Sequence, residues 1–171
     1  SHLVDHSALG MHYVRGTLAD QSPPPIAEIL DPATCAKHGF EPTEVVNEPG
    51  KTFHYSGGGF VVLEHLLESL EGKSVAELTR PFLAKAGLRS IRFDGAGESA
   101  TGYFDDGKPV SGTRFHFPAF AAGVLGTARD VALFLRHLSR AYRDIRGAPG
   151  ISHDTAVSML RGWDGGCHAF M

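Results

Sequence analysis

The sequence predicts a mainly α-helical chain with a small antiparallel β element, and three observations support this fold class. Apolar residues recur at helical spacing in two long segments, around residues 60–70 and 131–142. An Asp-Gly pair at 106–107 lies between two short segments of strand character, which is a hairpin signal. Strands and helices do not alternate along the chain, so the pattern does not favour a doubly wound parallel sheet.

The first two helices are expected on either side of Gly72, a residue suited to end a helix. The helix before it carries an apolar stripe at helical spacing: Phe60, Leu63, Leu67 and Leu70. The helix after it begins at Ser74, where Ser74 and Glu77 form a capping box. Its shared face consists of Val75, Leu78, Phe82 and Ala86. Pro81 lies inside this second pattern and predicts a kink or a split.

Two more helices are expected later in the chain. Thr127 and Asp130 form another capping box, and the stripe that follows is expected to be buried: Val131, Phe134, Leu135, Leu138 and Tyr142. A shorter helix follows Ser152 and continues through Leu160. Between the two helical pairs, residues 91–93 alternate like a strand, and a hairpin is predicted between 101–104 and 110–114.

Composition and charge exclude several classes of function. The 171 residues are 42% hydrophobic and 20% charged, which is ordinary for one globular domain with its own core. A formal net charge of −3 provides no basic surface for nucleic acid. No apolar run approaches the length of a membrane span. No charged-then-apolar leader begins the sequence, and both cytoplasm and periplasm remain open as compartments.

No cofactor and no metal site are expected. His2 and His6 are four residues apart, and a helix would place them on one face near Asp5 and His12. This spacing lacks the glutamate of the metalloprotease motif, so we interpret these histidines as structural. Nucleophile motifs are also missing, because the sequence has no Gly-x-Ser-x-Gly and no serine three residues before a lysine.

Four segments nevertheless resemble one family of serine hydrolases. Residues 49–60, Pro-Gly-Lys-Thr-Phe-His-Tyr-Ser-Gly-Gly-Gly-Phe, look like the second motif region of class C β-lactamases and penicillin-binding esterases. There an extended segment ends in Tyr-Ser-Asn before a long apolar helix. Residues 3–7, Leu-Val-Asp-His-Ser, are similar to the family's Leu-Leu-x-His-Thr segment. Residues 81–88 are similar to its Pro-Leu-Gly-Met corner, and residues 118–130 to its Ala-Gly-Gly-Leu-x-Ser-Thr-Ala-x-Asp helix entry.

The resemblance implies that Tyr55 is catalytic. In such enzymes a serine attacks an acyl carbon, a lysine one turn later supports the proton relay, and a tyrosine hydroxyl accepts or passes the proton. An extended segment before Tyr55 and a turn permitted by glycine after it would hold this side chain on a rigid turn. The alternative is an ordinary buried tyrosine with a satisfied hydroxyl.

Two further positions are implied as substrate-binding. Gly57 stands where the family has an asparagine whose amide helps to hold the carbonyl side of a lactam or peptide, which implies a preference for esters. Residues 162–166, Gly-Trp-Asp-Gly-Gly, loosely resemble the Trp-Gly-Gly variant of esterases and make Trp163 the second candidate.

The resemblance therefore implies the helical subdomain region of the β-lactamase/penicillin-binding-protein-like α+β fold. Residues 1–171 are expected to be a single fragment, truncated at both ends and inactive alone. The parent enzyme would hydrolyse a small ester, amide or β-lactam through an acyl-serine. The alternative is a non-catalytic helical binding domain of the same ancestry. Helical stripes without their sheet would leave apolar surface exposed and favour self-association.

Overall fold

The computed structural model describes residues 2–18, 20–93, 99–109, 115–145 and 149–160. Its helices are α1 (Ile26–Leu30), α2 (Gly57–Glu71), α3 (Val75–Ala86), α4 (Ala128–Tyr142) and α5 (His153–Leu160). A 3₁₀ turn, η1 (Cys35–His38), follows α1, and a π-helical turn, η2 (Ala119–Gly123), precedes α4. The strands are β1 (Thr17–Leu18) and β2 (Phe115–His116). The prediction of a mainly helical chain is confirmed.

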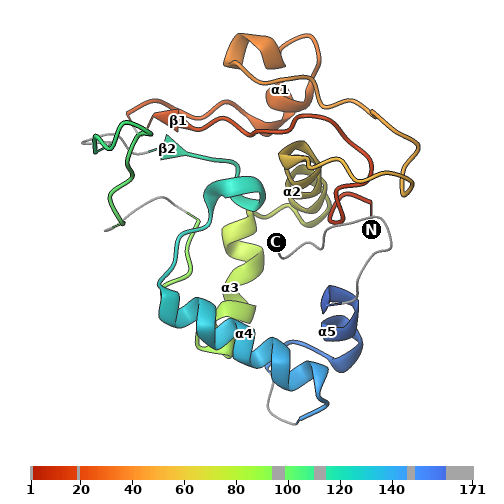
Figure 1. Ribbon diagram of the computed structural model, residues 1–171, viewed down its shortest axis with the longest axis vertical. Coiled ribbons are helices and arrows are strands. Elements are labelled where there is room, and N and C mark those ends of the chain that lie inside the picture. The colour runs from red at the N-terminus through yellow and green to blue at the C-terminus, as the bar shows by residue number, and fades with distance from the viewer. Residues whose placement is uncertain (1, 19, 94–98, 110–114, 146–148, 161–171) are drawn as a thin grey trace.

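The molecule has two ends joined by α2 and α3. Figure 1 shows α1 and the β1–β2 pair at one end and α4 with α5 at the other. The turn η2 packs against α2, and α4 packs against α5. No helix among the described residues is long and apolar enough to cross a lipid bilayer.

Two separate clusters of buried side chains form the core. The N-terminal cluster consists of Met11, Ile29, Cys35, Phe40 and Val61. The C-terminal cluster consists of Leu138, Ala141, Ile151 and Ala156. Each cluster therefore belongs to one end of the molecule, and the Tyr55 region adjoins the first.

The boundary between α2 and α3 forms as the sequence predicts. Gly72 ends α2 in a left-handed conformation with φ of 63°. The Ser74 side chain accepts from the Glu77 amide, and the Glu77 carboxylate accepts from the Ser74 amide at 2.9 Å, which completes the capping box. The helix α3 continues through Pro81 without the split that the sequence offered as one outcome. Both Pro81 and Glu77, whose carbonyl loses its helical partner, lie on the exposed side, where water can satisfy that carbonyl.

The second capping box is only half formed. Thr127 accepts from the Asp130 amide at 3.4 Å, as predicted. The Asp130 carboxylate, however, accepts from the Ser90 amide at 2.6 Å and from the Ser90 hydroxyl at 2.8 Å. A side chain expected to cap its own helix therefore ties α4 to the segment that follows α3.

The buried faces of α2 and α4 differ from the predicted stripes. On α4, Leu138 is buried, but three of the five residues of the predicted stripe are 48–50% exposed: Val131, Leu135 and Tyr142. On α2 the buried residues are Gly57, Gly58, Gly59, Val61 and Glu64. Leu70 of the predicted stripe is 72% exposed. Helical periodicity shows that an apolar face exists, but only the neighbouring elements determine which part of it meets the core.

The strand pairing also differs from the prediction. β1 and β2 are antiparallel and far apart in sequence, with Thr17 opposite His116 and Leu18 opposite Phe115. At the predicted hairpin, Tyr103 forms an isolated bridge with Pro109, and the expected second strand at 110–114 lies outside the described residues. The segment at 91–93 contributes a single antiparallel bridge, from Arg92 to Leu125.

Candidate active site

Tyr55 lies at the end of an extended segment, two residues before the first residue of α2. Tyr55 is 42% exposed and lies outside both buried clusters. A groove of about 370 Å³ opens beside it, lined by His12, Tyr13, Val14, Tyr55, Gly57, Ala121 and Ala122. The groove therefore joins the residues before β1, the start of α2 and the turn η2.

Ser56 fixes the turn between Tyr55 and α2. It is the N-cap of α2, and its hydroxyl oxygen accepts from the Gly59 amide at 3.1 Å. The same hydroxyl donates to the carbonyl of Gly10. Ser56 is 1% exposed, so both hydrogen bonds are shielded from water. Tyr55 thus precedes a helix end that is tied to a distant part of the chain.

The glycines that begin α2 allow the main chain of residues 10–14 to approach closely. A Cβ on Gly58 would lie 2.8 Å from Cβ of Met11 and 3.1 Å from the Gly10 carbonyl oxygen, closer than side chains tolerate. A Cβ on Gly57 would collide with Cγ2 of Val14. The Gly58 amide donates to the Met11 carbonyl at 3.1 Å. Glycine is required here because two backbones meet at hydrogen-bond distance.

Two histidine rings lie close to the Tyr55 ring. His6 stacks on it, with ring centroids 4.5 Å apart and an interplanar angle of 23°. His12 lies 5.3 Å away at 50°. His6 is buried, and its burial lowers the pKa of the imidazole, opposed by the Ser56 main chain and the charge of Asp5. His12 is exposed and lines the groove.

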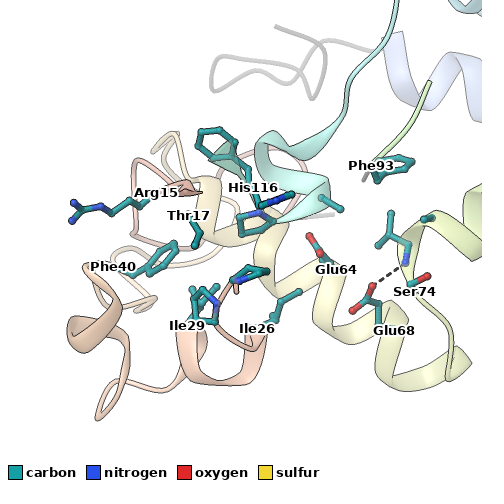
Figure 2. Close-up of a pocket in the computed structure, with 17 residues that line it drawn as sticks. Arg15, Thr17, Ile26, Ile29, Phe40, Glu64, Glu68, Ser74, Phe93 and His116 are labelled. Atoms are coloured by element: carbon teal, nitrogen blue, oxygen red, sulfur yellow. Dashed lines mark hydrogen bonds between the residues drawn. The ribbon is translucent and has the colours of Figure 1, made fainter. Parts of the chain in front are cut away.

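A second cavity, of about 300 Å³, lies elsewhere along α2 (Figure 2). Glu64 and Glu68 of α2 line this cavity, and each carboxylate accepts a hydrogen bond from a main-chain amide. Glu64 accepts from Phe120 at 2.9 Å and Glu68 accepts from Val75 at 2.8 Å. Burial raises the pKa of Glu64 above its usual range. Neither carboxylate is free for chemistry, so these residues attach η2 and α3 to α2.

The model of the beta-lactamase family matches residues 2–166. The chain belongs to the beta-lactamase family. No curated protein matches its sequence at a significant level.

Solved structures of similar fold agree with this family. A D-amino acid amidase from Ochrobactrum anthropi SV3 is 24% identical with a TM-score of 0.62, covering 92% of this chain and 45% of the amidase. A D-stereospecific amidohydrolase from Streptomyces sp. is 17% identical with a TM-score of 0.56, covering 96% and 51%. An octameric penicillin-binding protein homologue from Pyrococcus abyssi is 23% identical with a TM-score of 0.53, covering 70% and 27%.

At such identities the likeness establishes the fold. The chain spans about half or less of the length of these beta-lactamase-like structures.

The structure places two of the three sequence-predicted site residues of this beta-lactamase family chain together. Tyr55 and Gly57 line the same groove, whereas Trp163 lies outside the described residues. Two of the histidines considered for a metal have other hydrogen-bond partners. Nδ1 of His6 is hydrogen-bonded to the Ser56 main chain, and Nδ1 of His2 is hydrogen-bonded to the Ser7 hydroxyl. Within the described residues, no group of three or more metal-ligating side chains is close enough to hold an ion.

Sequence reasoning missed the other walls of the groove. Val14 and His12 follow the segment that resembles the family's Leu-Leu-x-His-Thr motif, and that proximity was the available signal. Ala121 and Ala122 lie within the segment that resembles the family's helix entry. Their role depends on η2 folding back onto α2, which small apolar residues alone do not indicate.

Proposed function

We propose that this chain forms one wall of the active-site cleft of a serine hydrolase in which Tyr55 carries the proton. The observation that supports this most is the position of Tyr55, half exposed on a fixed helix start beside a groove. Residues 1–171 would be a fragment of that enzyme's domain. The nucleophilic serine and its lysine would come from sequence outside it, because no serine here precedes a lysine by three residues.

The proposed reaction proceeds in two steps. The serine Oγ attacks the acyl carbon of the substrate while its proton passes to the deprotonated Tyr55 oxygen. Tyr55 returns that proton to the leaving alcohol or amine as the old acyl bond breaks. A water then attacks the acyl-serine and gives one proton to Tyr55. As the acyl–serine bond breaks, Tyr55 passes this proton to the serine Oγ, which releases the acid and restores both side chains. A rigid tyrosine is needed because a displacement of about 1 Å can cost a hundredfold in rate.

Gly57 and Val14 support a preference for esters over lactams. Gly57 stands where the resembling family has an asparagine, and any side chain at this position would collide with Val14. Val14, Ala121 and Ala122 make this part of the groove apolar. An amide group of a lactam substrate would find no side-chain partner at position 57, whereas an ester with an apolar acyl group needs none.

The role of Tyr55 is tested in the full-length enzyme with a matched pair of substitutions. We expect Tyr55→Phe to lower turnover by roughly 10²–10⁴-fold, the usual contribution of a positioned acid or base. Tyr13→Phe is the control, because Tyr13 is 79% exposed in the same groove and has no proposed role. A loss of less than a few-fold for Tyr55→Phe would make this tyrosine structural and would favour a binding domain.

The substrate class is tested by comparing three compounds. We expect a short-chain nitrophenyl ester to be hydrolysed faster than a chromogenic cephalosporin. D-Phenylalanine amide is included because amidases are among the similar structures. The double variant Gly57→Asn with Val14→Ala should raise cephalosporin turnover, whereas Gly57→Asn alone should not, because Val14 occupies the space. Faster cephalosporin turnover by the unchanged enzyme would contradict the ester preference.

The 171-residue chain alone should form no acyl adduct, because an unactivated serine is a weak nucleophile near neutrality. The measurement is intact mass after incubation with a fluorescent penicillin and with a fluorophosphonate probe. A stoichiometric mass increase on any serine would show that the nucleophile is present in this chain.

Self-association is also proposed, through a second copy of this chain. The exposed apolar residues on α2 and α4 are Leu66, Leu70, Val131, Leu135 and Tyr142. The homologue from Pyrococcus abyssi is octameric. Light scattering during gel filtration should show a mass above that of the monomer, and Leu70→Gln with Leu135→Gln should reduce it. A monomer at all concentrations would contradict the proposal.

A further inference from the structure

We infer that His6 is the positioning residue of this site, whose Nδ1 accepts from the Ser56 amide while its ring stacks on Tyr55. The inference rests on the proposed function, because it assigns to His6 the task of aiming the proton carrier. It concerns a histidine that does not itself line the groove.

The hydrogen bond determines which nitrogen of His6 carries the proton. Nδ1 lies 3.0 Å from the Ser56 amide nitrogen and 3.1 Å from the Ser56 carbonyl oxygen. A backbone N–H can only donate, so we assign Nδ1 as its acceptor, a role that requires an unprotonated Nδ1. The approach to the carbonyl oxygen would become a hydrogen bond only if Nδ1 were protonated. With Nδ1 protonated, its N–H and the Ser56 N–H would be two donors facing each other, and they would repel.

His6 contacts the Tyr55 segment through its main chain as well. The His54 amide donates to the His6 carbonyl oxygen at 2.7 Å. His6 has a left-handed backbone with φ of 56°, which non-glycine residues rarely adopt. Such conformations persist where the surroundings over-determine them, commonly at functional sites. Residue 6 therefore holds the residues on both sides of Tyr55 through its own carbonyl and its own ring nitrogen.

These contacts together define the direction of the Tyr55 side chain. The peptide that follows Tyr55 sets the direction of its Cα–Cβ bond, and the stacked His6 ring limits its rotation. Phe60 and Phe53 pack against His6 at centroid distances of 5.3 and 5.9 Å, so the imidazole itself has little room to move. His6 is 5% exposed, and water does not compete for Nδ1.

The surroundings of His6 favour the neutral ring. Burial is the main cause, and it lowers the pKa of His6 below the ordinary 6.5. Asp5, on the same segment, opposes this with its negative charge. Tyr55 stacks on the His6 ring, and the His12 ring lies 5.3 Å from the Tyr55 ring. Phe53 and Phe60 also pack against the ring and carry no charge. The lowered pKa favours the neutral imidazole, in which one ring nitrogen is an acceptor.

Two substitutions separate the acceptor from the ring. His6→Asn keeps an acceptor near the position of Nδ1 and tolerates a left-handed backbone, but removes the stacked ring. His6→Phe keeps a ring beside Tyr55 and removes the acceptor. His65→Asn and His65→Phe are the matched controls, because His65 is an exposed histidine on α2.

In the full-length enzyme we expect His6→Phe to lower kcat by about a hundredfold, with KM within about twofold, since a misaimed group slows chemistry and not binding. His6→Asn should lose about tenfold, and the His65 controls should stay within about twofold. Assays run well below each variant's melting temperature exclude unfolding as the cause. A kcat within about threefold of the unchanged enzyme for folded His6→Phe would overturn the inference, as would equal losses for both His6 variants.

A measurement on the 171-residue chain does not depend on catalysis. The ¹⁵N NMR signal of His6 Nδ1 should be that of an unprotonated ring nitrogen at pH 7, with ring-to-ring contacts between His6 and Tyr55. A protonated Nδ1 at pH 7 would overturn the inference. If the full-length enzyme hydrolysed none of the tested substrates while this signal appeared as expected, the proposed function would fail and the His6–Ser56 contact would stand.

Discussion

The two buried clusters of this molecule are built in different ways. The buried residues of the C-terminal cluster all come from the segment that contains α4 and α5, and Phe82 of α3 packs against them. The N-terminal cluster brings together residues 11, 29, 35, 40 and 61. Most of the chain between residues 11 and 61 is irregular, so segments distant in sequence meet to form this cluster. The Tyr55 region adjoins the N-terminal cluster.

Buried polar side chains link distant segments at both ends of the molecule, and at the C-terminal end Asp130 of α4 accepts from Ser90. Buried polar residues of the N-terminal region link distant segments, as His6 does with Ser56 and Ser56 with Gly10. His6 and Met11 also have left-handed backbones, with φ of 56° and 58°. Among the described residues of the C-terminal region, the left-handed ones are Gly150 and Asp144, and both residue types adopt this conformation more readily. The lesson is that the candidate site depends on backbone contacts across long sequence separations, whereas the buried residues of the C-terminal cluster come from helices that are neighbours in sequence.

The largest expected effect comes from truncating one buried residue in each cluster. Met11→Ala and Leu138→Ala should each lower the free energy of unfolding by about 2–5 kcal/mol, because each leaves a cavity. Only Met11→Ala should alter the ring contacts between His6 and Tyr55, because the Met11 side chain belongs to the same buried cluster as Val61 of α2. Urea unfolding and NMR of the aromatic rings measure both quantities. A changed Tyr55 environment in Leu138→Ala would show that the two ends are coupled.

The next comparison sets one helix cap against another. Ser56→Ala should cost about 2–3 kcal/mol, because it removes a cap and leaves buried main-chain groups without a partner. Thr127→Ala should cost about 1 kcal/mol, because Thr127 is exposed and water replaces its hydroxyl. Thermal and urea unfolding of both variants measure the difference. Equal costs would mean that the buried position of Ser56 adds nothing to its capping role.

The smallest effects concern pH, where the two regions should have opposite slopes. Burial raises the pKa of Glu64 above 4.5, so the folded chain keeps a proton that the unfolded chain loses. Stability then falls as pH rises from 4.5 through the folded pKa of Glu64. Hydrogen bonds from Ser90 lower the pKa of Asp130 below 3.8. Stability should therefore be lost as pH falls from 3.8 through the folded pKa of Asp130.

Two conservative variants isolate these slopes. Glu64→Gln keeps an acceptor for the Phe120 amide and should flatten the pH dependence above 4.5. Asp130→Asn should flatten it below 3.8. Urea midpoints measured across the acid range provide the comparison. A slope that survives in either variant would belong to another group.

Much of the helical framework could be predicted from the sequence. The Ser74 capping box, the end of α2 at Gly72 and the short helix α5 follow from local signals. These features depend on residues within one or two turns of each other, and the sequence displays such neighbours directly. The order of four family-like segments likewise identified Tyr55 and Gly57 as residues to examine.

Tertiary structure decided what the local signals left open. Asp130 satisfies the signal for a capping box, yet its carboxylate binds Ser90 because the segment after α3 lies against it. Val131, Leu135 and Leu138 all belong to the predicted apolar stripe, yet packing against α5 buries only Leu138 of these three, together with Ala141. β1 pairs with β2 across the whole middle of the chain, which short-range hairpin signals do not describe.

The sequence by itself determined the helical class, the helix boundaries around Gly72 and the family-like motif that contains Tyr55. It did not determine the groove, because that requires residues 12–14, the start of α2 and η2 to meet. Nor did it assign His6, whose spacing from His2 indicated only a weak metal pair. Its position against Ser56 and Tyr55 results from a left-handed turn and a close backbone approach, and both exist only once distant segments have packed together.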